Sequence, residues 1–138
     1  MGTRIAAGLA LLTGVALCGT ALAADATHHK LACPAQAPAA WGIGAHPLAG
    51  VEVLSAPHGE KIDETAPPSL VPDEQTRHGR TLQQVWTMNA DGPGWDFYVD
   101  CHYAQTARIL RLPAGGVARC ERRLLTARAD GPQSLTCD

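Results

Sequence analysis

The nonapeptide WDFYVDCHY, residues 95–103, has the clearest period-two pattern in this 138-residue chain and decides its fold class. Alternate side chains of a β-strand point to opposite faces of a sheet. The pattern therefore predicts an apolar face made by Trp95, Phe97, Val99, Cys101 and Tyr103. It predicts a solvent-exposed face made by Asp96, Tyr98, Asp100 and His102. One buried and one wet face are typical of an antiparallel sheet, and we expect Trp95 and Tyr103 in its core.

Further strands are predicted on both sides of this stretch. The candidate segments are 50–55, 82–88, 106–112, 117–125 and 134–137. Turn signals such as NADGPG at 89–94 and PAGG at 113–116 separate them. Residues 117–128 could instead form a short helix. We expect a mostly β fold of about five to seven strands, either a small antiparallel β-sandwich or an open β-barrel meander.

The first 23 residues predict a secretory signal peptide. Arg4 provides the positive end, residues 5–17 are apolar and uncharged, and Ala21-Leu22-Ala23 fits the cleavage pattern. The run is too short to span a bilayer, which needs roughly 20 apolar residues. Leu17 before Cys18 is a poor fit to lipoprotein processing, so we expect no lipid anchor. We therefore expect cleavage near Ala23, a periplasmic protein and no stable membrane insertion.

The mature chain is expected to have a flexible arm at residues 24–32 and a single domain at 33–138. This domain has four cysteines, Cys33, Cys101, Cys120 and Cys137. An even number in a short exported chain predicts disulfides. Three pairings are possible; we favour Cys120–Cys137, because the Asp130-Gly131 turn could make them cross-strand neighbours. Cys33–Cys101 would then tie the N-terminal arm to the central sheet.

Residues 56–80 predict a long loop, with at most a short edge strand at Leu70-Val71. Proline cannot donate to a sheet ladder, and the segment has four prolines. A loop of this length is either disordered or functional. Residues 25–100 have 10 acidic and 4 basic side chains, whereas residues 101–138 have 3 acidic side chains and 6 arginines. The acidic excess is concentrated in this loop.

Several of these features occur together in an order that resembles a known family. The elements are Cys33-Pro34, Trp86, Cys101-x-Tyr103-x-x-Thr106, Leu112-Pro113 and Cys120. Over residues 31–137 the chain resembles a family of small exported Gram-negative bacterial proteins of unknown function. The resemblance implies a periplasmic location and a β fold, and it supplies no catalytic residues. A looser likeness to small disulfide-bridged periplasmic lysozyme inhibitors extends only to architecture.

Candidate catalytic and metal-binding residues are few. Asp100 and His102 share a face, but alternate residues of one strand lie nearly 7 Å apart, too far to close a metal shell alone. The chain has no Gly-x-Ser-x-Gly motif and no phosphate-binding loop. We therefore expect no catalytic residues, no metal and no cofactor. The net charge of −2 argues against a nucleic-acid partner.

These observations favour a non-catalytic domain that binds another protein, as an inhibitor or immunity protein against a cell-wall-acting enzyme. We expect a cationic partner to contact the acids Glu60, Glu64, Asp73 and Glu74. Trp41 either covers one end of the sheet or is an exposed anchor. Two alternatives remain open: the acidic and basic halves merely neutralise each other, or the domain binds a small ligand or the cell envelope in the mouth of a barrel.

Overall fold

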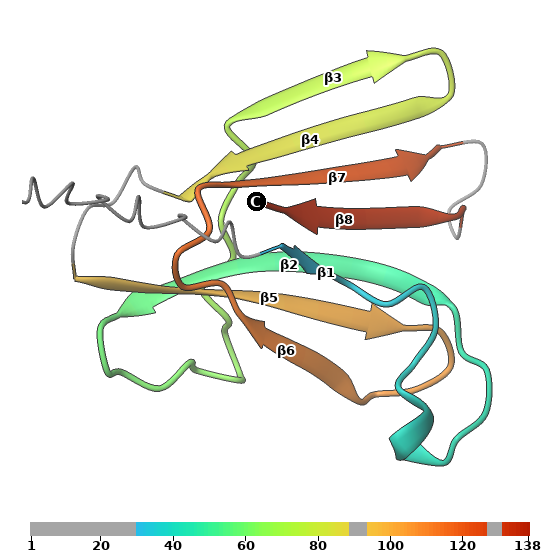
Figure 1. Cartoon of the computed structure of the whole chain (residues 1–138), viewed down its shortest axis with the longest axis horizontal. Helices are drawn as coiled ribbons and strands as arrows, with labels where there is room; N and C mark the ends of the chain where they lie inside the picture. The colour runs from blue at the N-terminus through green and yellow to red at the C-terminus, as the bar shows by residue number, and fades with distance from the viewer. Residues whose placement is uncertain (1–29, 89–93, 127–130) are drawn as a thin grey trace, which may run out of the picture.

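The computed structural model describes residues 30–88, 94–126 and 131–138, which form two antiparallel sheets (Figure 1). The predicted signal peptide, Cys18 and Asp130 lie outside these residues. The five-stranded sheet has the order β1-β8-β7-β4-β3. Its strands are β1 (Leu31–Ala32), β8 (Gln133–Cys137), β7 (Arg119–Leu125), β4 (Thr81–Thr87) and β3 (Glu74–His78). The three-stranded sheet is β2 (Leu48–Pro57), β5 (Trp95–Tyr103) and β6 (Ile109–Pro113), in that order.

The prediction of a mostly β fold is confirmed in its sandwich form. The chain changes sheet between β1 and β2, between β2 and β3, between β4 and β5, and between β6 and β7. Residues 39–41 form the 3₁₀ turn η1 (Ala39–Trp41), and residues 119–125 form a strand and not the alternative helix. Within the described ranges, no helix is long and apolar enough to cross a membrane.

The core lies between the two sheets and follows the period-two pattern of β5. Val99 and Cys101 are fully buried and Tyr103 is 3% exposed. They belong to the same apolar cluster as Trp86 of β4 and Leu135 of β8. Hydrophobic burial between the sheets is the main term that holds them together.

Trp95 is a correction to the predicted core, because its side chain is 44% exposed. It is the first residue of β5 and pairs with Pro57, the last residue of β2, at the end of the small sheet. The alternation places its side chain on the same face as Val99 and Cys101. A side chain on this face is buried only where the five-stranded sheet lies over it. The exposed fraction of Trp95 shows that the cover is incomplete there.

The prediction of a solvent-exposed face on β5 is wrong at Asp100. Asp100 is 1% exposed, and its neighbours on β2 of the same face, Leu54 and Ala56, are 0% and 3% exposed. The loop after β2 accounts for this burial, since its Glu64 reaches Arg111, which also bonds Asp100 on this face, before Ser69 returns to the edge of β2 and forms a bridge with Leu54. In Figure 1 this green segment turns back below β2 and β5 before it reaches β3. The outer face of the small sheet is therefore partly covered.

Both predicted disulfides are present. Cys120 and Cys137 are directly opposite each other on β7 and β8, whereas Cys33–Cys101 joins the end of β1 to β5 of the other sheet. The N-terminal segment begins to pair before Cys33. Leu31 and Ala32, which the sequence placed in a flexible arm, form β1 and pair with β8.

The loop predicted at 56–80 is shorter in the structure. Residues 74–78 form the exposed edge strand β3, and no strand forms at Leu70-Val71. His78 pairs with Thr81, so Gly79-Arg80 is a two-residue hairpin turn. Gly79 has φ +59°, a conformation that glycine adopts without strain and that such turns require. The connection that remains, residues 58–73, is called the acidic loop below.

Candidate functional site

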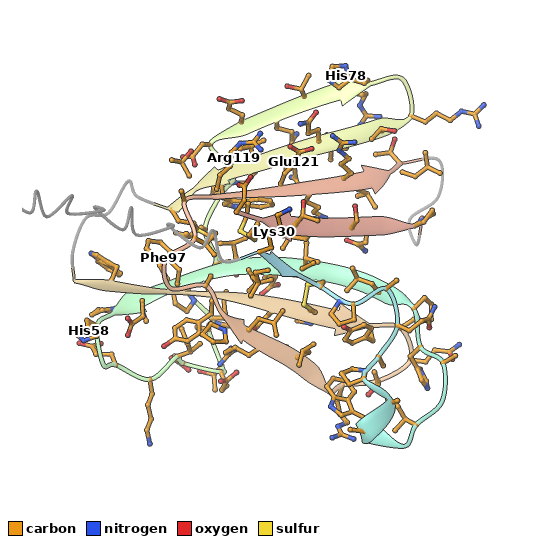
Figure 2. All side chains as sticks on the ribbon, in the orientation of Figure 1. Lys30, His58, His78, Phe97, Arg119 and Glu121 are labelled. Carbon is orange, nitrogen blue, oxygen red and sulfur yellow. A yellow bond between two sulfur atoms is a disulfide. The ribbon has the colours of Figure 1, made fainter. Side chains whose placement is uncertain are left out.

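The first residues of the acidic loop are fixed to the start of β5. His58 donates its backbone N–H to the Gly94 carbonyl at 2.7 Å. The Asp96 carboxylate accepts the Gly59 N–H at 3.0 Å and lies 2.9 Å from Nδ1 of His58. The Gly59 N–H and then His58 lower the pKa of Asp96, while Asp96 raises the pKa of His58. Figure 2 shows His58 at the end of β2, beside the start of the loop.

Arg111 of β6 fixes the middle of the loop. Its Nε and Nη2 donate to the two carboxylate oxygens of Asp100 at 2.8 and 2.7 Å, and Nη1 and Nη2 donate to Glu64. The Asp100 side chain is 2% exposed and that of Arg111 25%. Hydrogen bonds from Arg111 lower the pKa of Glu64, and the two carboxylates raise the pKa of Arg111. Bidentate pairs of this kind are the strongest ionic hydrogen bonds in proteins.

The last residues of the loop cross from the small sheet to the large one. Leu70 donates its N–H to Val53 of β2 at 2.7 Å and accepts Nε1–H of Trp86 at 3.0 Å. Asp73 donates its N–H to Val85 at 2.8 Å, and its carboxylate accepts the Thr87 N–H at 2.6 Å. The loop is thus held at its beginning, middle and end.

This anchored loop presents a strongly acidic surface. The acidic loop together with Glu74, the first residue of β3, contains five carboxylates and one lysine, a net charge of −4 with His58 neutral. Glu60 and Glu74 are exposed, and neither has an ion-pair partner among the described residues. Glu64 keeps 65% of its side chain exposed beside Arg111. Two of the four acids predicted to bind a partner, Glu64 and Asp73, therefore also hold the loop in place.

Trp41 does not join this surface. Its ring packs edge-on against Tyr103, with ring centroids 5.7 Å apart, and the Arg108 guanidinium lies 4.5 Å above it. Tyr103 ends β5, whereas the acidic loop begins beside the start of that strand. These contacts place Trp41 against one end of the small sheet, and its role as an anchor for a partner stays a prediction.

The three arginines of β7 are divided between the two faces of the five-stranded sheet. Arg119 and Arg123 donate to Glu121 at 3.0 and 2.7 Å, and these contacts lower the pKa of Glu121. On the opposite face, Arg122 donates to Gln133 and Gln84. Burial lowers the pKa of Arg122. The period-two spacing of residues 119, 121 and 123 was the signal that could have predicted the outer triad.

This outer triad borders an open groove of about 560 Å³. Its walls come from β1, β7 and β8 and include Lys30, Thr136 and Asp138. Figure 2 shows Arg119 and Glu121 side by side on β7. The groove has three cationic and two acidic side chains, so its lining is mixed in charge, unlike that of the acidic loop.

Among the described residues, no three His, Cys, Asp or Glu side chains lie close enough together to hold a metal ion. Asp100, half of the pair considered from the sequence, is engaged by Arg111. The oxygens that a cation would need are therefore already accepting hydrogen bonds from a guanidinium.

Comparison with known proteins gives one match. The profile of a family described as "Type VI secretion system Tli immunity protein" matches residues 43–138. The match includes the acidic loop, every strand except β1, and Cys101, Cys120 and Cys137. No curated protein and no solved structure matches the chain. The family profile has a functional description, which the resemblance noted from the sequence lacked.

Proposed function

The chain belongs to the type VI secretion system Tli immunity protein family, and we propose that it protects its own cell by binding and blocking a toxic effector. The effector is expected to be an enzyme that attacks the cell envelope, with the cell wall as the first substrate to test. Protection needs contact and no catalysis, in line with the absence of a catalytic set in the sequence.

The acidic loop is the observation that carries this proposal. An inhibitor gains affinity when its contact surface is ordered before binding, because less conformational entropy is then lost. Hydrogen bonds from β4, β5 and β6 and the edge of β2 order this loop in advance. Its net negative charge would attract a cationic effector and increase the association rate.

The binding experiment uses a purified candidate effector, an envelope-degrading enzyme sought among the genes beside this one. Glu60→Lys combined with Glu74→Lys changes two exposed acids and leaves the anchors Glu64 and Asp73 intact. We expect the association rate to fall by about tenfold, with a weaker dependence on salt. The matched control, Glu121→Lys with Asp138→Lys, changes two acids in the groove and should bind as the wild type does.

Two outcomes would contradict the proposal. If the groove variant loses binding and the loop variant does not, the contact surface is on the five-stranded sheet. If the wild-type protein neither binds nor blocks the effector, the immunity function itself is wrong.

We also propose that residues 1–23 direct export and that the mature protein acts in the periplasm. A variant that begins at residue 24 would then stay in the cytoplasm and fail to protect cells from the effector, although it should bind the effector in vitro after oxidative refolding. Protection by this variant from inside the cytoplasm would contradict the periplasmic site of action.

A further inference from the structure

Val71 is the most exposed large apolar side chain of the described residues, at 84%. The next, Trp95, is 44% exposed. A single exposed aliphatic residue is ordinary on a protein surface. The position of Val71 is unusual because the residues on both sides of it are held rigidly.

The backbone before and after Val71 is fixed by four hydrogen bonds. Leu70 is bonded through its N–H to Val53 and through its carbonyl to Trp86. Asp73 is bonded through its N–H to Val85 and through its carboxylate to Thr87. Pro72, between them, has a fixed φ. Val71-Pro72 is therefore a short apolar projection, called the knob below, with little freedom left to lose.

The surroundings of the knob are acidic. Asp73 and Glu74 follow it directly, and Glu52, on the adjacent strand β2, accepts a hydrogen bond from Ser69. The knob directly follows residues 68–70, which pair with the edge of β2, and the edge strand β3 begins three residues after Val71. A surface that combines one rigid apolar projection with three neighbouring carboxylates fits an apolar pocket with a cationic rim.

We propose that Val71 is the apolar anchor by which this protein enters a pocket of the effector, with Lys or Arg side chains of the effector meeting Asp73 and Glu74. This inference rests on the proposed immunity function and names the contact that would make it tight. Buried anchors near the centre of an interface dominate binding energies, while rim charges mainly affect the rate of encounter.

The test compares three variants, Val71→Ala, Val71→Arg and a control, in binding to the same purified candidate effector. Val71→Ala should raise Kd by about tenfold, and Val71→Arg by at least about a hundredfold, because a charge would have to enter the apolar pocket. The loss should appear mainly in the dissociation rate, unlike the loss caused by Glu60→Lys with Glu74→Lys.

Ile109→Arg is the matched control. Ile109 is 42% exposed on β6, at the opposite margin of the small sheet from the free edge of β2. This variant should bind the effector with unchanged rates. Thermal unfolding of all three variants should be close to that of the wild type, because neither side chain is part of the core.

The outcomes separate this inference from the proposed function. If the wild type binds and Val71→Arg binds equally well, the knob is not the anchor. If the wild type is a dimer in sedimentation and Val71→Arg is a monomer with normal effector binding, the knob joins two copies of this chain and the inference is overturned. If the wild type does not bind the effector, the immunity function fails first.

Discussion

The outer faces of the two sheets have the same kind of ionic cluster with the charges exchanged. On the small sheet, one arginine, Arg111, lies between the carboxylates of Asp100 and Glu64. On the large sheet, one carboxylate, Glu121, lies between Arg119 and Arg123. The first cluster includes a side chain that is 2% exposed, whereas the arginines of the second are 46% and 66% exposed.

The contribution of an ion cluster to stability depends on whether another segment covers it, and not on charge pairing alone. The acidic loop lies over the small sheet, so Asp100 is stable there only while Arg111 satisfies it. Among the described residues, no segment covers Arg119 and Arg123 in a comparable way. Both arginines are solvated, Glu121 between them is 16% exposed, and a groove is open beside the cluster.

The disulfides should show the largest difference between the regions. Cys33–Cys101 closes a sequence separation of 68 residues and joins the two sheets, while Cys120–Cys137 closes 17 within one sheet. Replacing each pair by alanine should lower the free energy of unfolding by about 4 and about 3 kcal/mol, respectively, since a longer closed loop restricts the unfolded chain more. Denaturant unfolding measures both. A larger loss for the pair within one sheet would show that its native contacts outweigh this term.

The buried ion cluster should matter more than the exposed one. Arg111→Met leaves Asp100 buried without a counter-ion and should lower the free energy of unfolding by about 3 kcal/mol. The matched change Arg123→Met should cost less than about 0.5 kcal/mol. Denaturant titration of both variants provides the measurement.

A double variant tests whether the unpaired charge of Asp100 causes the loss of stability. Asp100→Leu with Arg111→Met removes both buried charges and should recover most of the lost stability, because no unpaired charge remains. The double variant should still lose the Glu64 contact and therefore some order in the acidic loop. Equal losses for Arg111→Met and Arg123→Met would remove the distinction between the two faces.

The smallest effect is expected at the start of the loop. Because Asp96 raises the pKa of His58, the protonated ring stabilises the fold. This contribution is complete below the ordinary histidine pKa of about 6.5 and is lost as pH rises through the higher folded value. NMR titration should show His58 titrating above about 6.5 in the wild type and closer to it in Asp96→Asn. An unchanged titration in this variant would mean that another group raises the pKa.

Lowering the pH should weaken the anchoring of the acidic loop by its carboxylates. The pKa values of Asp96 and Glu64 are lowered in the folded protein. Their contributions are therefore present above the ordinary carboxyl pKa of about 4 and are lost as pH falls through the lower folded values. Hydrogen exchange of the loop amides should quicken on acidification relative to the intrinsic rate, before the amides of β5 change. Simultaneous loss of protection in the loop and in β5 would contradict separate anchoring of the loop.

Much of the sheet structure could be predicted from local sequence. The alternation at 95–103 correctly placed Val99, Cys101 and Tyr103 in the core. The strand β3 was missed because its five residues are all polar and exposed, so no apolar alternation marks them. The two-residue turn with Gly79 was the signal that could have revealed it.

The core strands could be predicted from local sequence, because period-two patterns and turns are properties of short segments. The burial of Asp100, the anchoring of the loop by Glu64 and the projection of Val71 could be seen only once the chain was folded. The contacts responsible for these features join distant parts of the chain: Arg111 and Glu64 are 47 positions apart, and the cover over a sheet face comes from whichever segment folds across it.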